Sequence, residues 1–225
     1  EQGLLLALDR DPVAVEAVQK RLLRFAERVR VLRSEYGAMT EQAREHGLGR
    51  GSLAGILMDL GVGSHQLDEP RRGFSFLRDG PLDMRYETDR GQTAADIVNT
   101  LPEGELARII RSLGEEARAR RVARAIVRRR ETEVFTRTGD LAEVVQRALG
   151  GRRGKRRHPA TKTFQALRLH VNAELDQLRS ALPQAVDLLE PGGRLVVISF
   201  HSLEDRQVKR FLQKQENPCT CPPDL

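Results

Sequence analysis

The 225-residue sequence predicts an α/β fold in which a parallel sheet is interrupted by an all-helical insertion. Short apolar runs alternate with amphipathic helical patterns near the start of the chain, and the same alternation returns near its end. Between them lies a long arginine-rich stretch without a convincing strand. Strands that alternate with helices over short connections are typical of a parallel sheet, so the two ends are expected to form one sheet.

The first elements follow one another closely. Leu4–Leu8 is a continuous apolar run, typical of a strand buried on both faces, and it ends at Asp9. Asp11 precedes Pro12, which places an N-cap residue before a favoured first helical position, so a helix is expected from Pro12 to about Phe25. The next expected elements are a strand over Val29–Leu32, a weak helix over Met39–His46 and a strand over Leu53–Met58 that ends at Asp59.

The closing elements repeat this pattern. Apolar residues at helical spacing predict one long helix over Ala166–Leu189, which Pro191-Gly192-Gly193 is expected to stop. A buried strand is expected over Leu195–Phe200. The run Ser202-Leu203-Glu204-Asp205 fits a capping box at the start of the last helix, whose apolar face carries Val208, Phe211 and Leu212.

The insertion defines the expected domains. We expect the sheet domain over residues 1–73 and 164–225 and the helical domain over residues 74–163. An insertion is the economical explanation because the strands on either side need each other to complete one sheet. It opens with a loop rich in Gly, Pro and Asp and continues as helices rich in arginine.

Positive charge concentrates in this insertion. The whole chain has a formal charge of +6, yet Glu105–Thr163 alone carries 17 basic and 7 acidic side chains. One cluster crowds a helix at Arg118–Arg130, and another fills a glycine-flanked loop at Arg152–Arg157. A solvated charged face would explain either cluster alone, but two clusters in one module favour contact with a phosphate backbone. Aromatic residues make up only 4% of the chain, so base stacking is not expected to dominate such binding.

Composition excludes two classes of protein, membrane-spanning proteins and disulfide-rich scaffolds. No apolar run approaches the roughly 18 residues that a membrane span needs, so no membrane partner is expected. The two cysteines, Cys219 and Cys221, are too few for a disulfide-stapled scaffold, and a reducing compartment such as the cytoplasm is the natural expectation. Free thiols are the simpler interpretation of this pair, because a metal site would need further ligands.

Two aspartates follow predicted strands, where open parallel sheets bind ligands. Asp9 could accept hydrogen bonds from both hydroxyls of a ribose, and the alternative is that it caps the next helix. Since Asp11 is better placed to cap, Asp9 is left without an evident structural task. Asp59 opens the run Asp59-Leu60-Gly61-Val62-Gly63-Ser64, whose glycines permit close approach of a ligand, although strand-Asp-x-Gly turns are common.

His201 follows the last predicted strand and is a candidate catalytic residue, with a structural hydrogen bond to a loop carbonyl as the alternative. Ser202 and Asp205 are assigned to helix capping, so they are not interpreted as a nucleophile and its acid. A Ser-His-Asp hydrolase is not expected, because no Gly-x-Ser-x-Gly turn occurs.

Six motifs, in order along essentially the whole chain, resemble one known family, the S-adenosylmethionine-dependent 16S ribosomal RNA (cytosine-N4) methyltransferases RsmH, also called MraW. They are Leu8-Asp9-Arg10-Asp11-Pro12, Asp59-Leu60-Gly61-Val62-Gly63-Ser64-His65-Gln66-Leu67-Asp68, Arg72-Gly73-Phe74-Ser75-Phe76, Asp79-Gly80-Pro81-Leu82-Asp83-Met84-Arg85, Ala160-Thr161-Lys162-Thr163-Phe164-Gln165-Ala166 and Ser199-Phe200-His201-Ser202-Leu203-Glu204-Asp205-Arg206.

The resemblance implies a Rossmann-like methyltransferase sheet with an inserted helical domain that recognises the substrate. It implies S-adenosyl-L-methionine as the cofactor, with Asp9 on its ribose, Tyr36 on its adenine side, and Asp59 and Gln66 completing the contacts. The implied substrate is a decoding-region cytidine of 16S rRNA in the small ribosomal subunit, methylated on its exocyclic nitrogen. Asp59 is then a candidate catalytic residue, as an acceptor for the cytosine amino group.

The resemblance also implies that the chain is truncated at both ends. Family members begin with a strand and a turn ending in Gly-Gly-His, and they extend beyond Leu225 with a basic tail. Two other functions remain open: a Rossmann enzyme that uses a nicotinamide dinucleotide, although no Gly-x-Gly-x-x-Gly turn occurs in the chain, and a non-catalytic RNA-binding or ribosome assembly factor.

Overall fold

The computed structural model describes residues 3–151 and 157–217, and it contains both helices and strands. Two compact units form, unit 1 over Glu1–Gly61 and Leu175–Leu225 and unit 2 over Val62–Glu174. The stretch 74–163, expected to be a separate helical domain, falls within unit 2. In the described part of the chain, no helix combines the length and apolar character needed to cross a bilayer.

Unit 1 holds all four strands that the structure describes. Its elements are β1 (Leu5–Asp9), α1 (Pro12–Leu22), η1 (Leu23–Phe25), β2 (Val29–Arg33), η2 (Tyr36–Ala38), α2 (Met39–Glu45), β3 (Leu53–Asp59), α9 (Glu174–Leu188), β4 (Leu189–Ile198) and α10 (Ser202–Glu216). The predicted cap of α1 is confirmed, since Asp11 is buried and its Oδ1 accepts a hydrogen bond from the Val13 amide at 2.9 Å.

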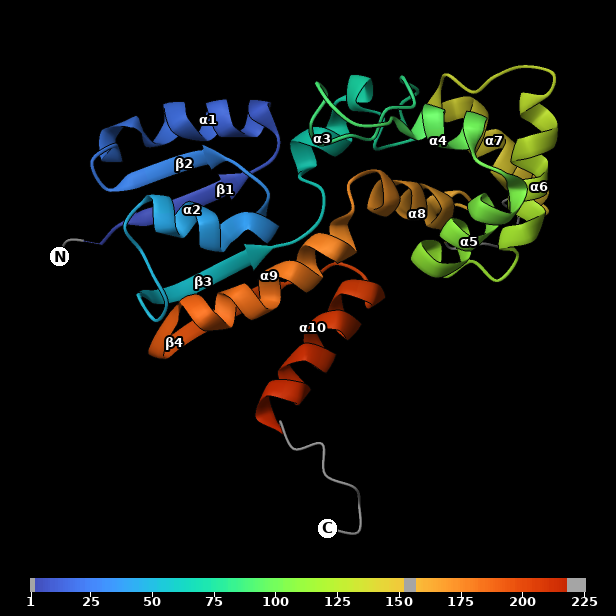
Figure 1. Cartoon of the computed structure of the whole chain (residues 1–225). Helices are drawn as coiled ribbons and strands as arrows, with labels where there is room; N and C mark the ends of the chain where they lie inside the picture. The colour runs from blue at the N-terminus through green and yellow to red at the C-terminus, as the bar shows by residue number, and fades with distance from the viewer. Residues whose placement is uncertain (1–2, 152–156, 218–225) are drawn as a thin grey trace, which may run out of the picture. The chain divides into compact units, whose positions relative to one another are not determined.

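The strands form two parallel pairs (Figure 1). β1 pairs with β2, so that Asp9 stands opposite Arg33. β3 pairs with β4, so that Asp59 stands opposite Ile198. β3 and β4 flank unit 2 in the sequence, which agrees with the expectation that strands on either side of the insertion pair. Among the described residues, however, the four strands are two sheets rather than the one that was expected.

The predicted helix over Ala166–Leu189 is wrong in one respect, because two helices occupy it. α8 (Thr161–Val171) ends at Asn172, Ala173 has a left-handed φ of 49°, and α9 follows. Both helices bury an apolar face, so apolar residues keep their helical spacing across the break. The spacing alone therefore does not reveal that one helix ends and another begins.

Two further predictions near the end of the chain are corrected. Pro191-Gly192-Gly193 does not separate a helix from a strand but lies inside β4, where the pairing register shifts after Leu189 and resumes at Arg194. β4 therefore begins earlier than expected. The expected turn residues lie in the irregular part of the strand, between Leu189 and Arg194. Ser202 is not the N-cap of α10, because His201 holds that position.

The core of unit 1 lies on one face of the β3–β4 pair. Met58 and the residues Ile56, Leu195 and Val197 pack against α2 and α9, whose buried contributors are Met39, Ala43, Leu178, Ala181, Leu182, Ala185 and Leu188. Leu6 and Leu8 of β1 pack against the same cluster. On the opposite face, Leu57 and its register partner Val196 remain 66% and 50% exposed.

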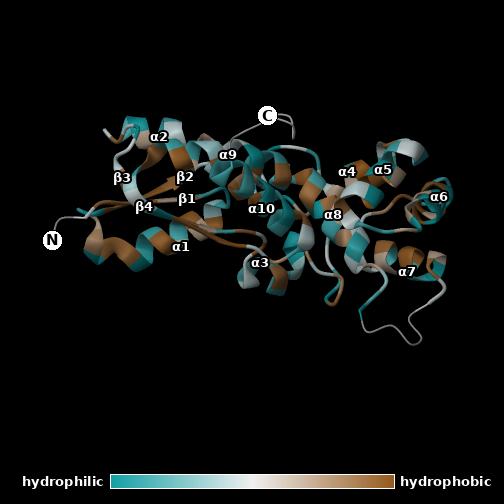
Figure 2. Ribbon diagram, turned by 90° about the horizontal axis from the view of Figure 1, so that it is seen from below, coloured by the Kyte–Doolittle hydropathy of each residue, from teal (hydrophilic) through white to brown (hydrophobic). Residues whose placement is uncertain are grey.

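Unit 2 is helical, and its described residues contain no strand. Its elements are α3 (Ser64–Asp68), η3 (Pro70–Arg72), α4 (Ala94–Thr100), α5 (Glu103–Gly114), α6 (Ala119–Arg130), α7 (Thr138–Ala148) and α8. One extensive apolar core joins α4 through α8 with the loop that precedes them. Figure 2 shows hydrophilic and hydrophobic residues alternating along α5, α6 and α7, as expected for helices that bury one face.

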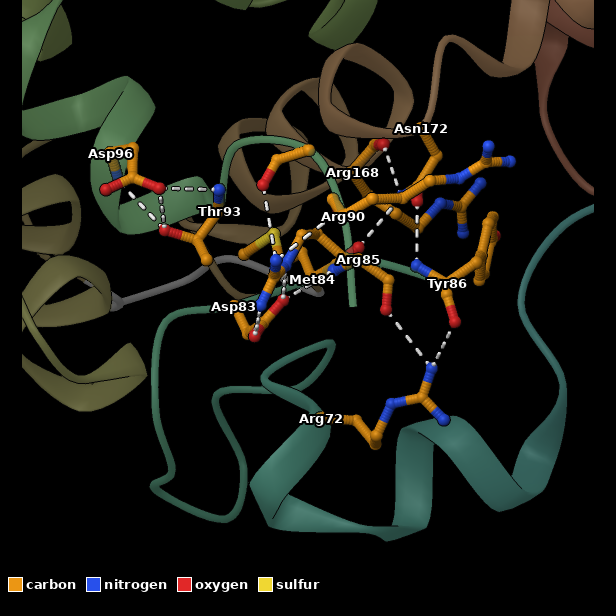
Figure 3. A network of polar contacts seen from close by, with 11 residues as sticks. Arg72, Asp83, Met84, Arg85, Tyr86, Arg90, Thr93, Asp96, Arg168 and Asn172 are labelled. Atoms are coloured by element: carbon orange, nitrogen blue, oxygen red, sulfur yellow. Dashed lines mark hydrogen bonds and ion pairs between the residues drawn. The ribbon is translucent and has the colours of Figure 1, made fainter. Parts of the chain in front are cut away.

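The loop between η3 and α4 is fixed by the polar network in Figure 3. Met84 is fully buried and has a left-handed φ of 65°. Asn172, at the end of α8, donates from Nδ2 to the Met84 carbonyl at 2.8 Å and accepts from the Tyr86 amide at 2.9 Å. Arg72 donates to the carbonyls of Arg85 and Tyr86 at 3.1 and 3.0 Å. Asn172, where α8 ends, therefore also connects this loop to α8 through its side-chain hydrogen bonds.

Candidate functional site

Asp9 and Asp59 each end a parallel strand of unit 1, and both are exposed. The expectation that Asp9 has no structural task is wrong, because its Oδ1 accepts the Asp11 amide at 2.8 Å. Asp9 therefore supports the backbone that enters α1, while Asp11 caps the helix itself. The hydrogen bond to the local backbone holds this exposed carboxylate in position at the strand end.

Tyr36 lies at the same edge of the β1–β2 pair as Asp9. The Ser34 amide donates to the Asp9 carbonyl at 3.0 Å, which joins the ends of the two strands. Arg10 and Glu35 add an ion pair of 3.1 Å between the same two ends. Tyr36 begins η2 directly after Glu35, and its half-buried ring packs against the core of unit 1. A carboxylate that ends β1 and an aromatic ring that follows β2 thus lie at the same edge of this strand pair.

Two glutamines of α9 hold the segment that carries Tyr36, and the sequence patterns did not identify them. Gln177 accepts the Gly37 amide at 3.1 Å and donates to Glu35. Gln184, two turns further along, accepts the Thr40 amide at 2.9 Å and donates to the Gly37 carbonyl. In the sequence both residues look like part of a solvated polar face, so only the tertiary structure reveals this contact.

Asp59 leads into a turn that is fixed by β4. The Leu60 amide donates to the Ile198 carbonyl at 3.0 Å, which continues the β3–β4 ladder by one residue. Gly61 then takes a φ of 93°, a backbone conformation that residues with a side chain rarely adopt. This turn ends the first segment of unit 1, because the division between the units follows Gly61.

Gln66, the remaining candidate for a cofactor contact, lies in unit 2. Its side chain is 4% exposed, and its Oε1 accepts the Gly63 amide at 2.9 Å at the first turn of α3. The structure thus brings Asp9 and Tyr36 together within unit 1 and assigns the Gln66 side chain to the start of its own helix.

His201 is oriented by Glu204, which is 2% exposed. The Glu204 amide donates to His201 Nδ1 at 3.4 Å, so the proton of the neutral imidazole belongs on Nε2. Nε2 in turn lies 3.2 Å from Glu204 Oε1, and the Phe200 amide donates to Oε2 at 3.1 Å. One buried carboxylate therefore fixes both the histidine and the backbone that leaves β4. In the sequence, Glu204 is recognisable only as part of a capping box.

The basic clusters are described in part. Arg152, Arg153, Lys155 and Arg156 lie outside the described residues, as do Cys219 and Cys221. In the helix cluster, Arg129 binds Glu133, and Arg130 donates to the carbonyls of Val98 and Leu101 at 2.7 and 2.8 Å. Within the described ranges, no three metal-binding side chains gather as a metal site would require.

Known proteins are similar to this chain along essentially its whole length. The sequence model of the MraW methylase family matches residues 1–225. Several relatives carry the name "Ribosomal RNA small subunit methyltransferase H". The one from Syntrophotalea carbinolica is 53% identical over 99% of this chain and 71% of its own length. The relative from Heliobacterium modesticaldum is 48% identical over 100% and 72%, and that from Carboxydothermus hydrogenoformans is 49% identical over 98% and 70%. Because the family model matches the whole chain and the relatives are about 50% identical, this chain, with Asp9 and Asp59 at its strand ends, belongs to the MraW methylase family.

Proposed function

We propose that this protein is an S-adenosylmethionine-dependent methyltransferase that modifies the exocyclic N4 of a decoding-region cytidine in 16S rRNA. The family membership and the names of the relatives support the reaction and the RNA substrate. The single structural observation that carries the proposal is the edge of unit 1, where Asp9 and Asp59 end parallel strands. The soluble small subunit makes the cytoplasm the expected place of action.

The sheet of unit 1 is proposed to be Rossmann-like. β1 and β3 each pair on one side only among the described residues, so one further parallel strand between them would join all four strands. Both pairs already share one core through α2 and α9. In such an open parallel sheet, ligands bind beyond the carboxyl ends of the strands, where both aspartates lie. Unit 2, which contains the proposed insertion over residues 74–163, is then the domain that recognises RNA.

The residues at the strand ends fit the cofactor. The exposed Asp9 carboxylate would accept hydrogen bonds from the ribose hydroxyls, and such charge-assisted bonds contribute about 1.5–3 kcal/mol each. The Tyr36 ring would lie on the adenine side, held in place by Gln177 and Gln184. Gln66 is proposed as a further cofactor contact on the strength of the resemblance alone, since its side chain accepts the Gly63 amide at the start of α3.

S-adenosylmethionine supplies an electrophilic methyl group on a positively charged sulfur, and its leaving group departs neutral. The difficult partner is the cytosine amino group, whose lone pair is delocalised into the ring. Asp59 would accept a hydrogen bond from that amino group, which localises the lone pair and aims it at the methyl carbon. Orientation of this kind can recover about 7–11 kcal/mol of an activation barrier. A dedicated base is not needed, because the methylated nitrogen loses its extra proton readily.

His201 is proposed to act by positioning. Nδ1 accepts the Glu204 amide and Nε2 lies 3.2 Å from Glu204 Oε1 without a hydrogen bond, so His201 is proposed to help fix the turn between β4 and α10. The target cytosine must also leave its stack to reach the edge of the sheet, at a cost of a few kcal/mol. Contacts between arginines of unit 2 and the RNA would offset that cost.

The proposal is tested by Asp59→Ala, with Asp187→Ala as the matched control because Asp187 is an exposed carboxylate of unit 1 outside the site. Methyl incorporation into unmodified small ribosomal subunits is measured, and the modified base is mapped. Asp59→Ala should abolish incorporation and leave RNA retention unchanged, while the control should behave like the wild type. Unchanged turnover in Asp59→Ala would refute the assigned role.

One alternative rests on a specific observation, the exposed arginines of unit 2. A non-catalytic RNA-binding or assembly factor would retain small-subunit RNA but transfer no methyl group to it. Calorimetry separates a further alternative, a nicotinamide enzyme, because that protein would bind NAD in preference to S-adenosylmethionine.

A further inference from the structure

The arginines of α6 fall into two groups that the sequence cannot distinguish. Arg129 and Arg130 serve the fold of unit 2. Arg129 lies 5.5 Å above the Phe135 ring and binds Glu133, and Arg130 satisfies the carbonyls of Val98 and Leu101 at the end of α4. Carbonyls at a helix end lack partners within the helix, so Arg130 has a clear structural task.

The second group forms an exposed stripe, which we call the α6 stripe: Arg120, Arg121, Arg124 and Arg128. Helical geometry places these residues on the side opposite Val122, Ala123 and Ile126, which are fully buried. Within the described ranges, Arg124 has only a 3.6 Å contact with the partly exposed Glu103, and the side chains of the other three have no ion-pair or hydrogen-bond partner.

The spacing of the α6 stripe opposes local helix stability. Arg120, Arg124 and Arg128 succeed one another at intervals of four residues, where like charges face each other and repel. Several pairs at this spacing in other helices carry opposite charges, namely Glu16–Lys20, Glu143–Arg147 and Asp205–Lys209, whereas α10 repeats like charges at Arg206, Arg210 and Lys214. α6 contains no acidic residue that could relieve the repulsion. A polyanion bound along the stripe would relieve it.

We infer that the α6 stripe is the surface of unit 2 that contacts consecutive phosphates of the RNA substrate, an inference that rests on the proposed function. From Arg120 to Arg128 the helix rises about 12 Å, because each residue adds about 1.5 Å. Phosphates of one stacked strand follow each other about every 3.4 Å along the axis, so the stripe faces about three or four of them. An anionic membrane is a poorer fit, since the exposed side of α6 has no large apolar residue to insert.

The test compares charge removal on the α6 stripe with equal charge removal elsewhere. The stripe variant combines Arg120→Gln, Arg124→Gln and Arg128→Gln. The control variant combines Arg21→Gln, Arg44→Gln and Arg210→Gln, three exposed arginines of unit 1. The dissociation constant for a transcribed 16S rRNA fragment carrying the decoding region is measured between 50 and 200 mM salt, roughly the range where phosphate contacts dominate.

The stripe variant should reduce the slope of log K against log salt by about 2 if the contacted RNA is single-stranded and by about 3 if it is helical. At 0.1 M salt its affinity should fall about 100-fold, as expected for the loss of three phosphate contacts. The control should lose less than half of that slope change. Equal losses in the two variants would overturn the inference, because they would indicate a response to net charge alone.

Arg128→Gln and Arg130→Gln provide a second comparison within one helix. Arg128→Gln should weaken RNA binding without lowering the melting temperature, since it relieves repulsion. Arg130→Gln should lower the melting temperature and leave the salt slope unchanged, because it removes the bonds to Val98 and Leu101. The reverse pattern would contradict the assignment of the two groups.

The outcomes separate the inference from the proposed function. If the stripe variant binds the RNA fragment as the wild type does, the α6 stripe is not the RNA surface, even when the wild type methylates small subunits. If the stripe variant loses only binding to phosphatidylserine vesicles, the stripe faces a membrane and the inference fails. If the wild type transfers no methyl group but the stripe variant loses RNA affinity, the inference stands and the proposed function fails.

Discussion

The two units bury their apolar residues in different ways. In unit 2, large side chains from several helices and the preceding loop are fully buried, among them Met84, Ile110, Ile126, Phe135 and Leu141. In unit 1, the most deeply buried residues lie on α9, and the strands remain partly exposed. Parallel sheets are normally covered on both faces. The helical unit is thus stabilised from within, whereas the β3–β4 pair of unit 1 is covered on the face that packs against α2 and α9 and leaves its other face exposed.

The largest difference should appear when one phenylalanine is removed from each unit. Phe135→Ala empties a fully buried site in unit 2 and should destabilise the protein by about 3–5 kcal/mol. Phe211→Ala, in the partly exposed face of α10, should cost less than half of that. Urea unfolding followed by circular dichroism measures both changes. Equal losses would contradict the contrast between the two cores.

Close helix packing in unit 2 provides the next test. A Cβ on Gly114 would lie 2.4 Å from the backbone oxygen of Lys162, so Gly114→Ala must push α5 away from α8. Overpacking of this kind costs about 1–3 kcal/mol. Gly104→Ala is the control in the same helix, because a Cβ added there would meet no other atom within 4 Å. The control should stabilise the protein by about 0.4–1 kcal/mol, and thermal unfolding distinguishes the two signs.

Asp79 is expected to make the stability of unit 2 sensitive to acid. The hydrogen bond from the Gly139 amide, aided by Arg137, lowers the pKa of Asp79 below its ordinary value. A carboxyl group with a lowered folded-state pKa adds stability above its unfolded pKa and loses it as the pH falls through the folded value. Asp79 is 45% exposed, so solvent screening limits the effect, and Asp79→Asn should cost about 1 kcal/mol or less at neutral pH.

This difference between the wild type and Asp79→Asn should vanish once the pH lies below the lowered pKa, as urea unfolding at several pH values would show. Asp68→Asn changes an exposed carboxylate of the same unit and is the matched control. A difference that persists in acid would mean that the charge of Asp79 is not the stabilising feature.

The smallest effect is expected on the open face of β3. Leu57 is 66% exposed, so Leu57→Ser should change stability by less than about 0.5 kcal/mol. Met58→Ser, one residue further and 6% exposed, should be clearly destabilising. Similar losses in both variants would show that the outer face of β3 is covered in solution, and the contrast between the units would need revision.

Local signals were predictable from the sequence, and tertiary ones were not. The Asp11 cap and the end of β3 at Asp59 depend on neighbouring residues, so short patterns identified them. The left-handed Ala173 and the shifted register after Leu189 depend on packing partners that lie far away in the sequence. Apolar spacing therefore predicted the presence of helices and strands better than their ends.

The candidate site shows the same limit. Strand-end carboxylates follow from the order of elements, which is why Asp9 and Asp59 could be named in advance. Gln177 and Glu204 could not, because polar residues on a helix resemble a solvated face until the packed structure shows their partners. Among the arginines, composition indicated a basic module but could not separate Arg130, which holds α4, from Arg128, which does not.

At Met84, the cost of a strained backbone conformation opposes the gain from filling a buried site with a side chain. A left-handed conformation costs a residue other than glycine roughly 1–3 kcal/mol, whereas emptying a buried methionine site costs roughly 2–5 kcal/mol. Glycine would thus relax the chain locally and still leave the protein weaker, because its missing side chain would open a void in the middle of unit 2. Engineers who seek a more robust variant should therefore leave this residue unchanged, even though a survey of backbone angles alone would single it out for replacement.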